Sequence, residues 1–443
     1  MKPKKSAYKW LIFGLWVIPF FGLTQSQANR ELKLALNEDG SNYLKANFTA
    51  QIWARYIENN PGSTLFGNQK NTSYDIGLRR VRAQFYGKVH PKIFLYTQLG
   101  INNQNANNTR KPGIFFHDVL GEFEVTPKGL QIGMGLSAWT GFGRFSAPAV
   151  ASILGSDAPL YQQSTNDVTD QFLRKFSIYA KGKLGKLDYR LAFTQPMSVQ
   201  TAPANSIQAF GLHSTFSTKA PKLQTSAYAM WQFLDKESNT TPYMAGTYLG
   251  KKKIFNVGVG YQYQAKAMWR QGDTIFKAPY IIEEDLFNYQ IDFFYDAPVG
   301  KKGSALSAYL ALTQMGFGKH YLRNAAVMNP VDASSLTSLN GGGNGVPLYG
   351  TGQVWYFQTG YLLPPNLFGK RDIFLQPYFQ YINAQYDALS SPMNLFDLGV
   401  NYFLDGQKSK LSFNFQNRPN YQIKDGKMNS RKNTFLIQFQ IAI

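Results

Sequence analysis

The densest group of basic side chains lies in residues 78–88, which read LRRVRAQFYGK and contain Arg79, Arg80, Arg82 and Lys88. Successive side chains of an extended chain point to opposite faces, so Arg80, Arg82 and Lys88 would share one face, and the residues between them would form an apolar face. Guanidinium and ammonium groups aligned in this way donate charge-assisted hydrogen bonds to anions. The spacing predicts a surface that binds or conducts anions.

The same alternation places more basic side chains on one face of a later segment. Apolar residues occupy one face of residues 175–193, and the basic residues on the other are Lys175, Lys181, Lys183 and Arg190. These charges could line a channel, where rings of arginine and lysine lower the barrier for anions. They could also pair with carboxylates and only fill a wall. The basic surplus of the chain is nevertheless too large for internal pairing to neutralise all of it.

A long segment, residues 139–171, separates two further arginines, with Arg144 near its start and Arg174 just beyond its end. The segment is poor in charge and rich in Gly, Ala, Ser and Pro, as a plain surface loop would be. Its middle contains Ala, Val, Ile and Leu residues, which are more often buried. We therefore expect a loop that folds against the interior wall of a channel and narrows it.

Residues suited to catalysis or metal binding are few and widely separated. His213 adjoins Ser214, but neighbours in a strand face opposite sides and cannot act together as base and nucleophile. The glycines of residues 141–143 and 341–345 do not lie between a strand and a helix, which argues against a phosphate-binding loop. The four histidines show no metal-ligand spacing; they are His90, His117, His213 and His320. We expect no enzyme activity and no cofactor.

Alternating apolar and polar residues identify the elements that would hold the basic side chains. Residues 433–443, at the end of the chain, place Phe435, Ile437, Phe439 and Ile441 on one face. A soluble terminus rarely carries so many large apolar residues, whereas a strand between lipid and water in a closed barrel does. The same alternation occurs in residues 44–56, 255–264, 287–295 and 411–416.

Turn-forming residues divide the chain into short connections and longer loops. Short connections are expected at residues 90–91, 126–129, 184–186, 219–221, 250–253, 298–302, 364–370 and 405–407. Longer loops are expected at residues 59–73, 139–171, 239–242 and 316–350. Short periplasmic turns that alternate with longer extracellular loops are the pattern of outer-membrane barrels. The count predicts an all-β, antiparallel transmembrane β-barrel of 18 strands, with 16 as the alternative. The competing β-sandwich usually has domains nearer about 100 residues.

Residues 1–28 have the composition of a cleaved signal peptide. Four lysines precede an apolar stretch at residues 10–23, which is too short to span about 30 Å of hydrocarbon. Removal of this segment leaves residues 29–443 as a single barrel domain without cysteine, and the net charge of +20 becomes +16 without the four lysines. Such a surplus implies an anionic partner. Export and barrel periodicity argue against nucleic acid, so anionic solutes and lipopolysaccharide phosphates are expected.

The order of three motifs carries a resemblance to a known family. Residues 79–82 (RRVR) with Lys88 come first, residues 116–125 (FHDVLGEFEV) follow, and residues 133–135 (GMG) lead into the long loop. Over about residues 43–200 this order resembles the phosphate-selective porin O and P family, in its Bacteroidota-type branch. The remainder is similar to that family only as barrel strands.

The resemblance implies a homotrimeric outer-membrane barrel, usually of sixteen strands, with an anion path lined by arginine and lysine. Arg79, Arg80, Arg82 and Lys88 match by position, while Arg144 and Arg174 match more weakly. The chain departs from the pattern in its 18 expected strands and in ending with Ile443, where barrels of this class usually end in an aromatic residue.

These observations together predict a bacterial outer-membrane porin. We expect passive diffusion of small hydrophilic solutes with a preference for anions, phosphate among them. The alternative is a non-conducting structural or secretion-associated barrel of the outer membrane. The expected partners are outer-membrane lipids and lipopolysaccharide, small anionic solutes, the barrel-assembly machinery and further copies of the chain in a homotrimer.

Overall fold

The computed structural model describes residues 31–108, 110–200, 212–272, 280–301, 303–332, 337–365 and 373–443. The expected signal peptide and parts of the expected turns at 298–302 and 364–370 lie outside these residues. None of the helices in the described part of the chain is long and apolar enough to cross a membrane.

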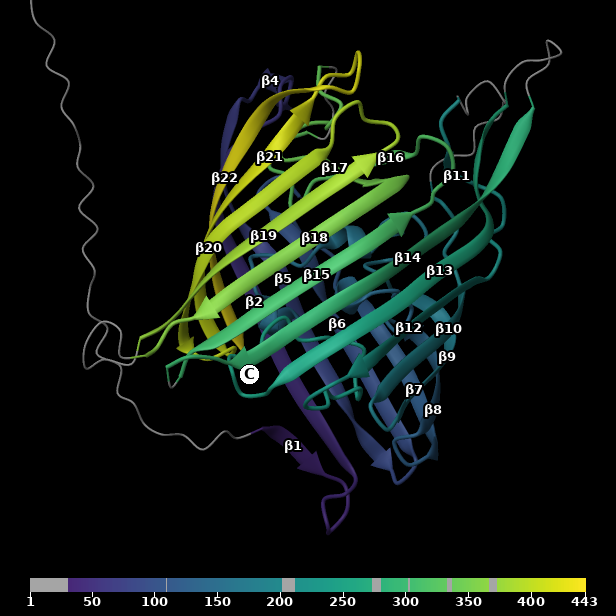
Figure 1. Ribbon diagram of the computed structural model, residues 1–443, viewed down its shortest axis with the longest axis vertical. Coiled ribbons are helices and arrows are strands. Elements are labelled where there is room, and N and C mark those ends of the chain that lie inside the picture. Colours follow the sequence, from purple (N-terminus) through teal and green to yellow (C-terminus); the bar gives the residue numbers. More distant parts are fainter. Residues whose placement is uncertain are drawn as a thin grey trace, which may run out of the picture. The chain divides into compact units, whose positions relative to one another are not determined.

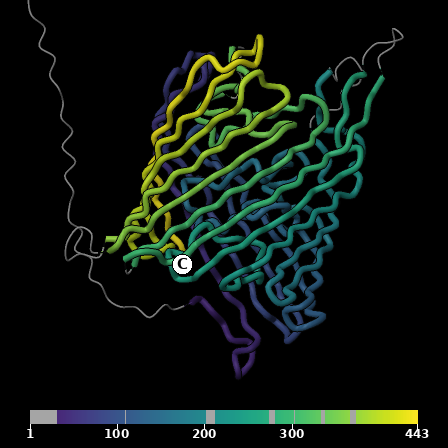
Figure 2. Tube along the Cα trace, in the orientation of Figure 1, coloured from purple at the N-terminus to yellow at the C-terminus, as the bar shows by residue number. Residues whose placement is uncertain are grey.

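Within the described residues, sixteen antiparallel strands form a closed ring, whose tilted strands are visible in Figure 1 and as a continuous trace in Figure 2. Each strand pairs with the next, and pairing between the first and the last, for example Ile52 with Phe439, closes the ring. In chain order the ring strands are β2 (Tyr43–Glu58), β5 (Thr72–His90), β6 (Ile93–Asn105), β7 (Phe115–Thr126), β8 (Leu130–Ser137), β9 (Lys175–Leu184), β10 (Leu187–Gln195), β12 (Gln224–Gln232), β13 (Ile254–Gln271), β14 (Ile281–Pro298), β15 (Ala305–Met315), β18 (Gly352–Leu362), β19 (Phe374–Tyr386), β20 (Met393–Asp405), β21 (Ser409–Tyr421) and β22 (Met428–Ala442).

Several short elements lie outside the ring. β1 (Leu32–Ala35) pairs with the start of β2, and β11 (Thr215–Phe216) pairs with β13, so both extend the sheet without entering the ring. The other short elements are the pairs β3 (Thr64–Leu65) with β4 (Asn68–Gln69) and β16 (Leu322–Ala325) with β17 (Val346–Gly350), and the 3-10 helices η1 (Arg144–Ser146), η2 (Val150–Ser152) and η3 (Leu160–Gln162).

The expected count of 18 ring strands is wrong, and the alternative of 16 is confirmed for the described part of the chain. Residues 219–221 do not form a short turn of their own. They are part of the longer loop that joins β10 to β12, which are direct neighbours in the ring. Residues 239–242 and 250–253, expected as a loop and a turn, belong to one connection between β12 and β13. Turn-forming residues show that the chain changes direction but not at which end of the barrel it does so.

The two faces of the ring differ in the way that the alternation predicts. On β22, Phe435 and Ile437 are 52% and 46% exposed on the outer face, whereas Gln438 and Gln440 are completely buried inside. A soluble antiparallel sheet places its apolar face on the core and its polar face in water. The reverse arrangement, with an apolar outer belt and a polar interior, suits a barrel surrounded by lipid.

The two ends of the ring also differ. At one end, which we call the turn end, short turns join β5 to β6 and β9 to β10, and the chain terminates there at Ile443. At the other end, the loop end, long connections such as the one between β15 and β18 occur. In outer-membrane barrels the turns face the periplasm and the loops face outward. The connection between β12 and β13 is a long one at the turn end.

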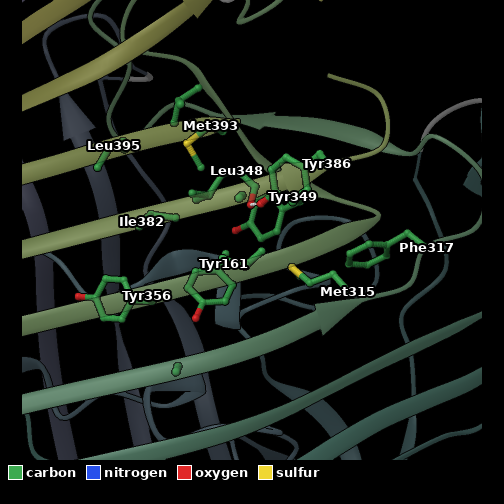
Figure 3. Packing of buried hydrophobic residues seen from close by; sticks show 14 of the residues in the cluster. Tyr161, Met315, Phe317, Leu348, Tyr349, Tyr356, Ile382, Tyr386, Met393 and Leu395 are labelled. Carbon is green, nitrogen blue, oxygen red and sulfur yellow. Dashed lines mark hydrogen bonds between the residues drawn. The ribbon is translucent and has the colours of Figure 1, made fainter. Parts of the chain in front are cut away.

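Loop side chains form an apolar core inside the ring. Tyr161, from the loop between β8 and β9, is completely buried and lies beside Tyr356 of β18, with ring centroids 6.2 Å apart. Figure 3 shows these two rings among Tyr349, Ile382 and Tyr386, which come from β17 and β19. The long connections at the loop end are therefore packed into the lumen, where they determine the shape of any path through the barrel.

Candidate functional site

The loop between β8 and β9, residues 138–174, folds inside the ring, and we call it the inner loop. Lys410 on β21 donates a hydrogen bond from Nζ to the carbonyl oxygen of Ile153 at 2.8 Å, and Asn401 on β20 donates to that of Leu154 at 2.7 Å. β20 and β21 lie across the ring from β8 and β9. The prediction that this loop folds against the interior wall is therefore confirmed.

Arg79 and Arg80 both point into the lumen because β5 bulges at this position. The pairing register of β5 with β2 shifts between Gln51 and Ile52, which interrupts the alternation of faces. Arg79 Nη2 lies 2.6 Å from Asp157 Oδ2, and Arg80 Nη2 lies 2.5 Å from Asp157 Oδ1. One carboxylate of the inner loop therefore holds two guanidinium groups and leaves one positive charge in excess.

Asp157 is kept in its charged form by this arrangement. Burial alone would raise its pKa, but the neighbouring Arg79 and Arg80 outweigh burial and hold the pKa of Asp157 below its ordinary value. Asp157 was not identified from the sequence. It lies 77 residues from Arg80 in the chain, and nothing in the local pattern of the inner loop links the two positions.

Most of the other basic residues predicted from the sequence are also paired. Lys88 and Lys183 are partly exposed, and the other five basic residues are buried: Arg144, Arg174, Lys175, Lys181 and Arg190. The nitrogen–oxygen distances are 3.3 Å for Lys88–Glu124, 2.7 Å for Arg144–Glu237, 3.4 Å for Arg174–Asp118, 2.9 Å for Lys175–Asp170, 2.8 Å for Lys181–Glu122, 3.7 Å for Lys183–Asp188 and 3.8 Å for Arg190–Asp188. The sequence had left such pairing open, and the role of these residues in an anion path stays a prediction.

Arg82 differs from the other predicted residues. It donates hydrogen bonds to the carbonyl oxygens of Val81 at 2.9 Å and Ile101 at 2.8 Å, and to the side-chain oxygen of Asn102. Among the described residues, no carboxylate lies within ion-pair distance of it. Arg82 is 3% exposed, and its Nε has no hydrogen-bond partner. Its positive charge is therefore stabilised by hydrogen bonds to neutral acceptors and is not compensated by an acid.

Arg82 lines a cavity of about 340 Å³ in the part of the lumen nearer the turn end. Residues 149–151 of the inner loop and Tyr243 close the side opposite the wall. The charged side chains of the lining are those of Arg82 and Lys408. The wall strands β2, β5 and β6 contribute uncharged polar groups from Asn47, Thr49, Gln84, Tyr86, Tyr96 and Gln98.

A second cavity, of about 110 Å³, lies toward the loop end. Asp157 belongs to its lining, together with Trp53 of β2, Tyr356 of β18 and Asp397 of β20. Parts of the connection between β15 and β18 cover it from the loop end. The two cavities thus lie on either side of the contact between the inner loop and the arginines of β5.

A second segment, residues 233–253, enters the ring from the turn end, and the sequence did not predict it. Lys181 donates a hydrogen bond from Nζ to the carbonyl oxygen of Asn239 at 2.8 Å, and Arg190 donates from Nη1 to that of Pro242 at 3.0 Å. The sequence signal that could have revealed this segment was its length, because the other connections at the turn end are short. Three of the predicted basic residues bind this segment: Lys181, Lys183 and Arg190.

Comparison with known proteins identifies the fold. No family model matches the chain, and no characterised protein matches it in sequence. Three solved structures of similar fold are an anion-selective porin from Comamonas acidovorans (10% identity, TM-score 0.50, covering 91% of this chain and 100% of that chain), OmpF of Salmonella typhi in complex with daunomycin (8%, 0.51, 92% and 99%) and OprB of Pseudomonas putida at high pH (9%, 0.51, 91% and 95%). The chain has the fold of an outer-membrane porin.

The location of the chain follows from this fold and from its surface. A closed ring satisfies the hydrogen bonds of every strand, which is the condition for strands to cross a bilayer. The outer belt is apolar and the interior is polar, as they are in transmembrane barrels. The chain is therefore a β-barrel of the bacterial outer membrane, with the sixteen strands that the resemblance implied.

Proposed function

We propose that the protein is a passive diffusion channel for small hydrophilic solutes that prefers anions, and that residues 29–443 form it after removal of residues 1–28. The observation that carries this proposal is the polar lumen, in which the inner loop meets Arg79 and Arg80 through Asp157 and leaves a cavity on each side. A loop held against a charged wall narrows a barrel without a separate plug domain. The likeness to porins, among them an anion-selective one, supports the same function.

The proposed preference for anions rests on the uncompensated positive charges. Arg82 has no acidic partner among the described residues, and Arg79 and Arg80 share one carboxylate. Same-face residues of a strand lie about 6.6–7 Å apart, which is within the Debye length of about 8 Å in physiological salt. An anion could pass between Arg80 and Arg82 and exchange water for charge-assisted hydrogen bonds. Phosphate is one such anion, in keeping with the resemblance to the phosphate-selective family.

The proposal includes the partners expected of such a channel. The apolar outer belt supports contact with membrane lipids, lipopolysaccharide and the barrel-assembly machinery. Further copies of the chain would complete a homotrimer, as the resemblance implies. Chemical cross-linking in detergent, followed by electrophoresis, would separate a trimer from a monomer.

The competing proposal is a non-conducting structural or secretion-associated barrel. It is favoured by the extent to which the inner loop and residues 233–253 fill the lumen. A channel should give steady ionic current in a planar lipid bilayer, and in a KCl gradient its reversal potential should report chloride as more permeant than potassium. Phosphate added to one side should reduce the chloride current if phosphate enters the same path. Folded protein that inserts without any current would favour the competing proposal.

A further inference from the structure

Residues 233–253, which we call the strap, cross the lumen beneath the inner loop. At one side the hydroxyl groups of Thr247 and Ser307, a residue of β15, lie 2.8 Å apart. At the other side the hydroxyl of Tyr243 donates a hydrogen bond to Asp118 of β7. β7 and β15 are well separated around the ring. The strap therefore spans the interior and is not a turn that follows the rim.

The strap and the inner loop hold each other. Met244 pairs with Pro148 in a β-bridge, and its backbone nitrogen donates to the carbonyl oxygen of Ala147 at 2.9 Å. Arg144 of the inner loop donates from both terminal nitrogens to the two carboxylate oxygens of Glu237, each at 2.7 Å. Both side chains of this ion pair are almost completely shielded from solvent. We call the pair of Arg144 and Glu237 the latch.

The strap is held by polar contacts and by a few apolar ones, among them the packing of Met244 against Tyr228 and Met230. The chain has no cysteine, so no disulfide fixes the strap to the wall. Carbonyl oxygens of the strap cap the basic side chains of β9 and β10, which would otherwise face the lumen; these are Lys181, Lys183 and Arg190. Polar contacts of this kind exchange for water when water is admitted, in contrast to an apolar core. Withdrawal of the strap would therefore exchange its polar contacts for water and would also uncover the apolar contacts of Met244 and Tyr243.

We propose that the strap is a gate, held closed by the latch, and that its withdrawal toward the turn end opens a second, strongly basic route along β9 and β10. This inference rests on the proposed diffusion channel. Lys181 is paired with Glu122, while Lys183 and Arg190 share the single carboxylate of Asp188. The uncovered wall would therefore carry excess positive charge. The open state would conduct more than the latched state and would be more selective for anions.

The first test is Glu237→Gln, measured in planar bilayers beside the wild type. The substitution keeps the shape of the side chain but removes the charge that holds Arg144. We expect a larger single-channel conductance, more frequent transitions between conductance levels, and a reversal potential shifted toward chloride. The matched control is Glu283→Gln, which removes a partly exposed carboxylate that is paired with Lys219 at the loop end, outside the lumen, and should leave the current unchanged.

A cross-link separates movement of the strap from loss of a charge. Pro148→Cys combined with Met244→Cys places two thiols opposite each other in the β-bridge, and the wild-type chain contributes no other cysteine. Bridged Cα atoms in a disulfide are usually about 4.4–6.8 Å apart, which neighbouring strands satisfy. Combined with Glu237→Gln, the oxidised pair should restore the wild-type conductance, and reduction should release the larger one. Heat-modifiable migration on a gel checks that every variant is folded.

Each outcome decides the question. An effect of Glu237→Gln that persists in the oxidised protein, or no effect of either change, overturns the gate and leaves the channel standing. A silent wild type beside a conducting Glu237→Gln variant overturns the steady channel and supports the gate. Silence in both overturns both proposals. If Glu237→Gln does not fold, Arg144→Lys takes its place, because a lysine keeps the charge but loses the bidentate contact of the latch. A larger current from the reduced than from the oxidised cysteine pair in that variant supports the gate, and equal currents overturn it.

Discussion

Arg144 and Glu237 meet inside the barrel although their segments enter it from opposite ends. Arg144 begins η1 in the inner loop, which starts and ends at the loop end, and Glu237 belongs to the strap, which starts and ends at the turn end. The two residues form a bidentate ion pair with both distances at 2.7 Å. The exposed fractions of their side chains are 0% and 2%. The pair therefore joins two connections that belong to opposite ends of the ring.

Glu237→Ala should destabilise the folded barrel. Removing one member of a buried ion pair leaves the other charge without compensation, at a cost of about 3–5 kcal/mol. Urea-induced unfolding in lipid vesicles, followed by tryptophan fluorescence, measures the free energy of unfolding. As a control, Glu283→Ala breaks pairs with Lys219 and Lys266 that are exposed to water, and the unfolding midpoint should stay near that of the wild type. Equal stability of Glu237→Ala and wild type would contradict the buried pair.

Ile437→Arg should impair folding into a bilayer. Ile437 is 46% exposed on the outer face of β22, and an arginine facing lipid near mid-membrane costs about 2–4 kcal/mol. Asn433 lies on the same face of the same strand, nearer the loop end. Asn433→Arg should cost about 0–1 kcal/mol, because a charge near the interface reaches water. Folded yield in vesicles, read from heat-modifiable migration, compares the two. Similar losses for both would mean that this face does not lie in lipid.

The sequence predicted the barrel because alternation is a local property. Alternation along β22 assigns each of its residues to the outer or the inner face without information from any other strand. The structure places Phe435 outside and Gln438 inside, as expected. The number of strands depends instead on which end of the barrel each connection occupies. Residues 219–221 and 239–242 have turn-forming composition, but that composition is the same at both ends. The count was therefore wrong by two, and the strap was read as a loop and a turn.

The candidate site was predicted less completely because its partners are distant in the chain. Arg80 and Arg82 were placed on the lumen face by alternation alone, and the structure agrees. Arg79 faces inward because of a bulge, which is a property of the pairing between β5 and β2. Glu237 lies 93 residues from Arg144, so local spacing could not show that it neutralises that arginine. The net charge alone could not decide whether the basic residues pair with carboxylates or line a conducting path.

Arg82→Gln should shift selectivity toward cations more than removal of an exposed lysine does. Arg82 lines the cavity nearer the turn end and has no acidic partner among the described residues, so its loss changes the potential along the proposed path. Lys219→Gln removes the same charge from an exposed side chain at the loop end, paired with Glu283. Reversal potentials of both variants in a KCl gradient give the comparison. If both leave chloride equally favoured, Arg82 does not contribute to the path.

Acidification should increase the preference for chloride through Asp157. The folded pKa of Asp157 lies below its ordinary value because Arg79 and Arg80 outweigh burial. Its ion pairs therefore stabilise the fold at pH values above the unfolded pKa, and this contribution is lost as the pH falls through the lower, folded pKa. In the same window, protonation leaves Arg79 and Arg80 without their counter-ion. Reversal potentials measured over a series of decreasing pH values should move toward chloride.

Asp157→Asn should reproduce this acidic state at neutral pH. The amide keeps the size of the side chain but removes the negative charge that the two guanidinium groups share. The variant should therefore prefer chloride more strongly than the wild type at pH 7, and its additional shift on acidification should be smaller. Asp235→Asn, an exposed carboxylate of the strap, is the control and should retain the wild-type response to pH. A variant at Asp157 that still shows the full acidic shift would assign the titration to another carboxylate of the lumen, such as Asp397 in the cavity toward the loop end.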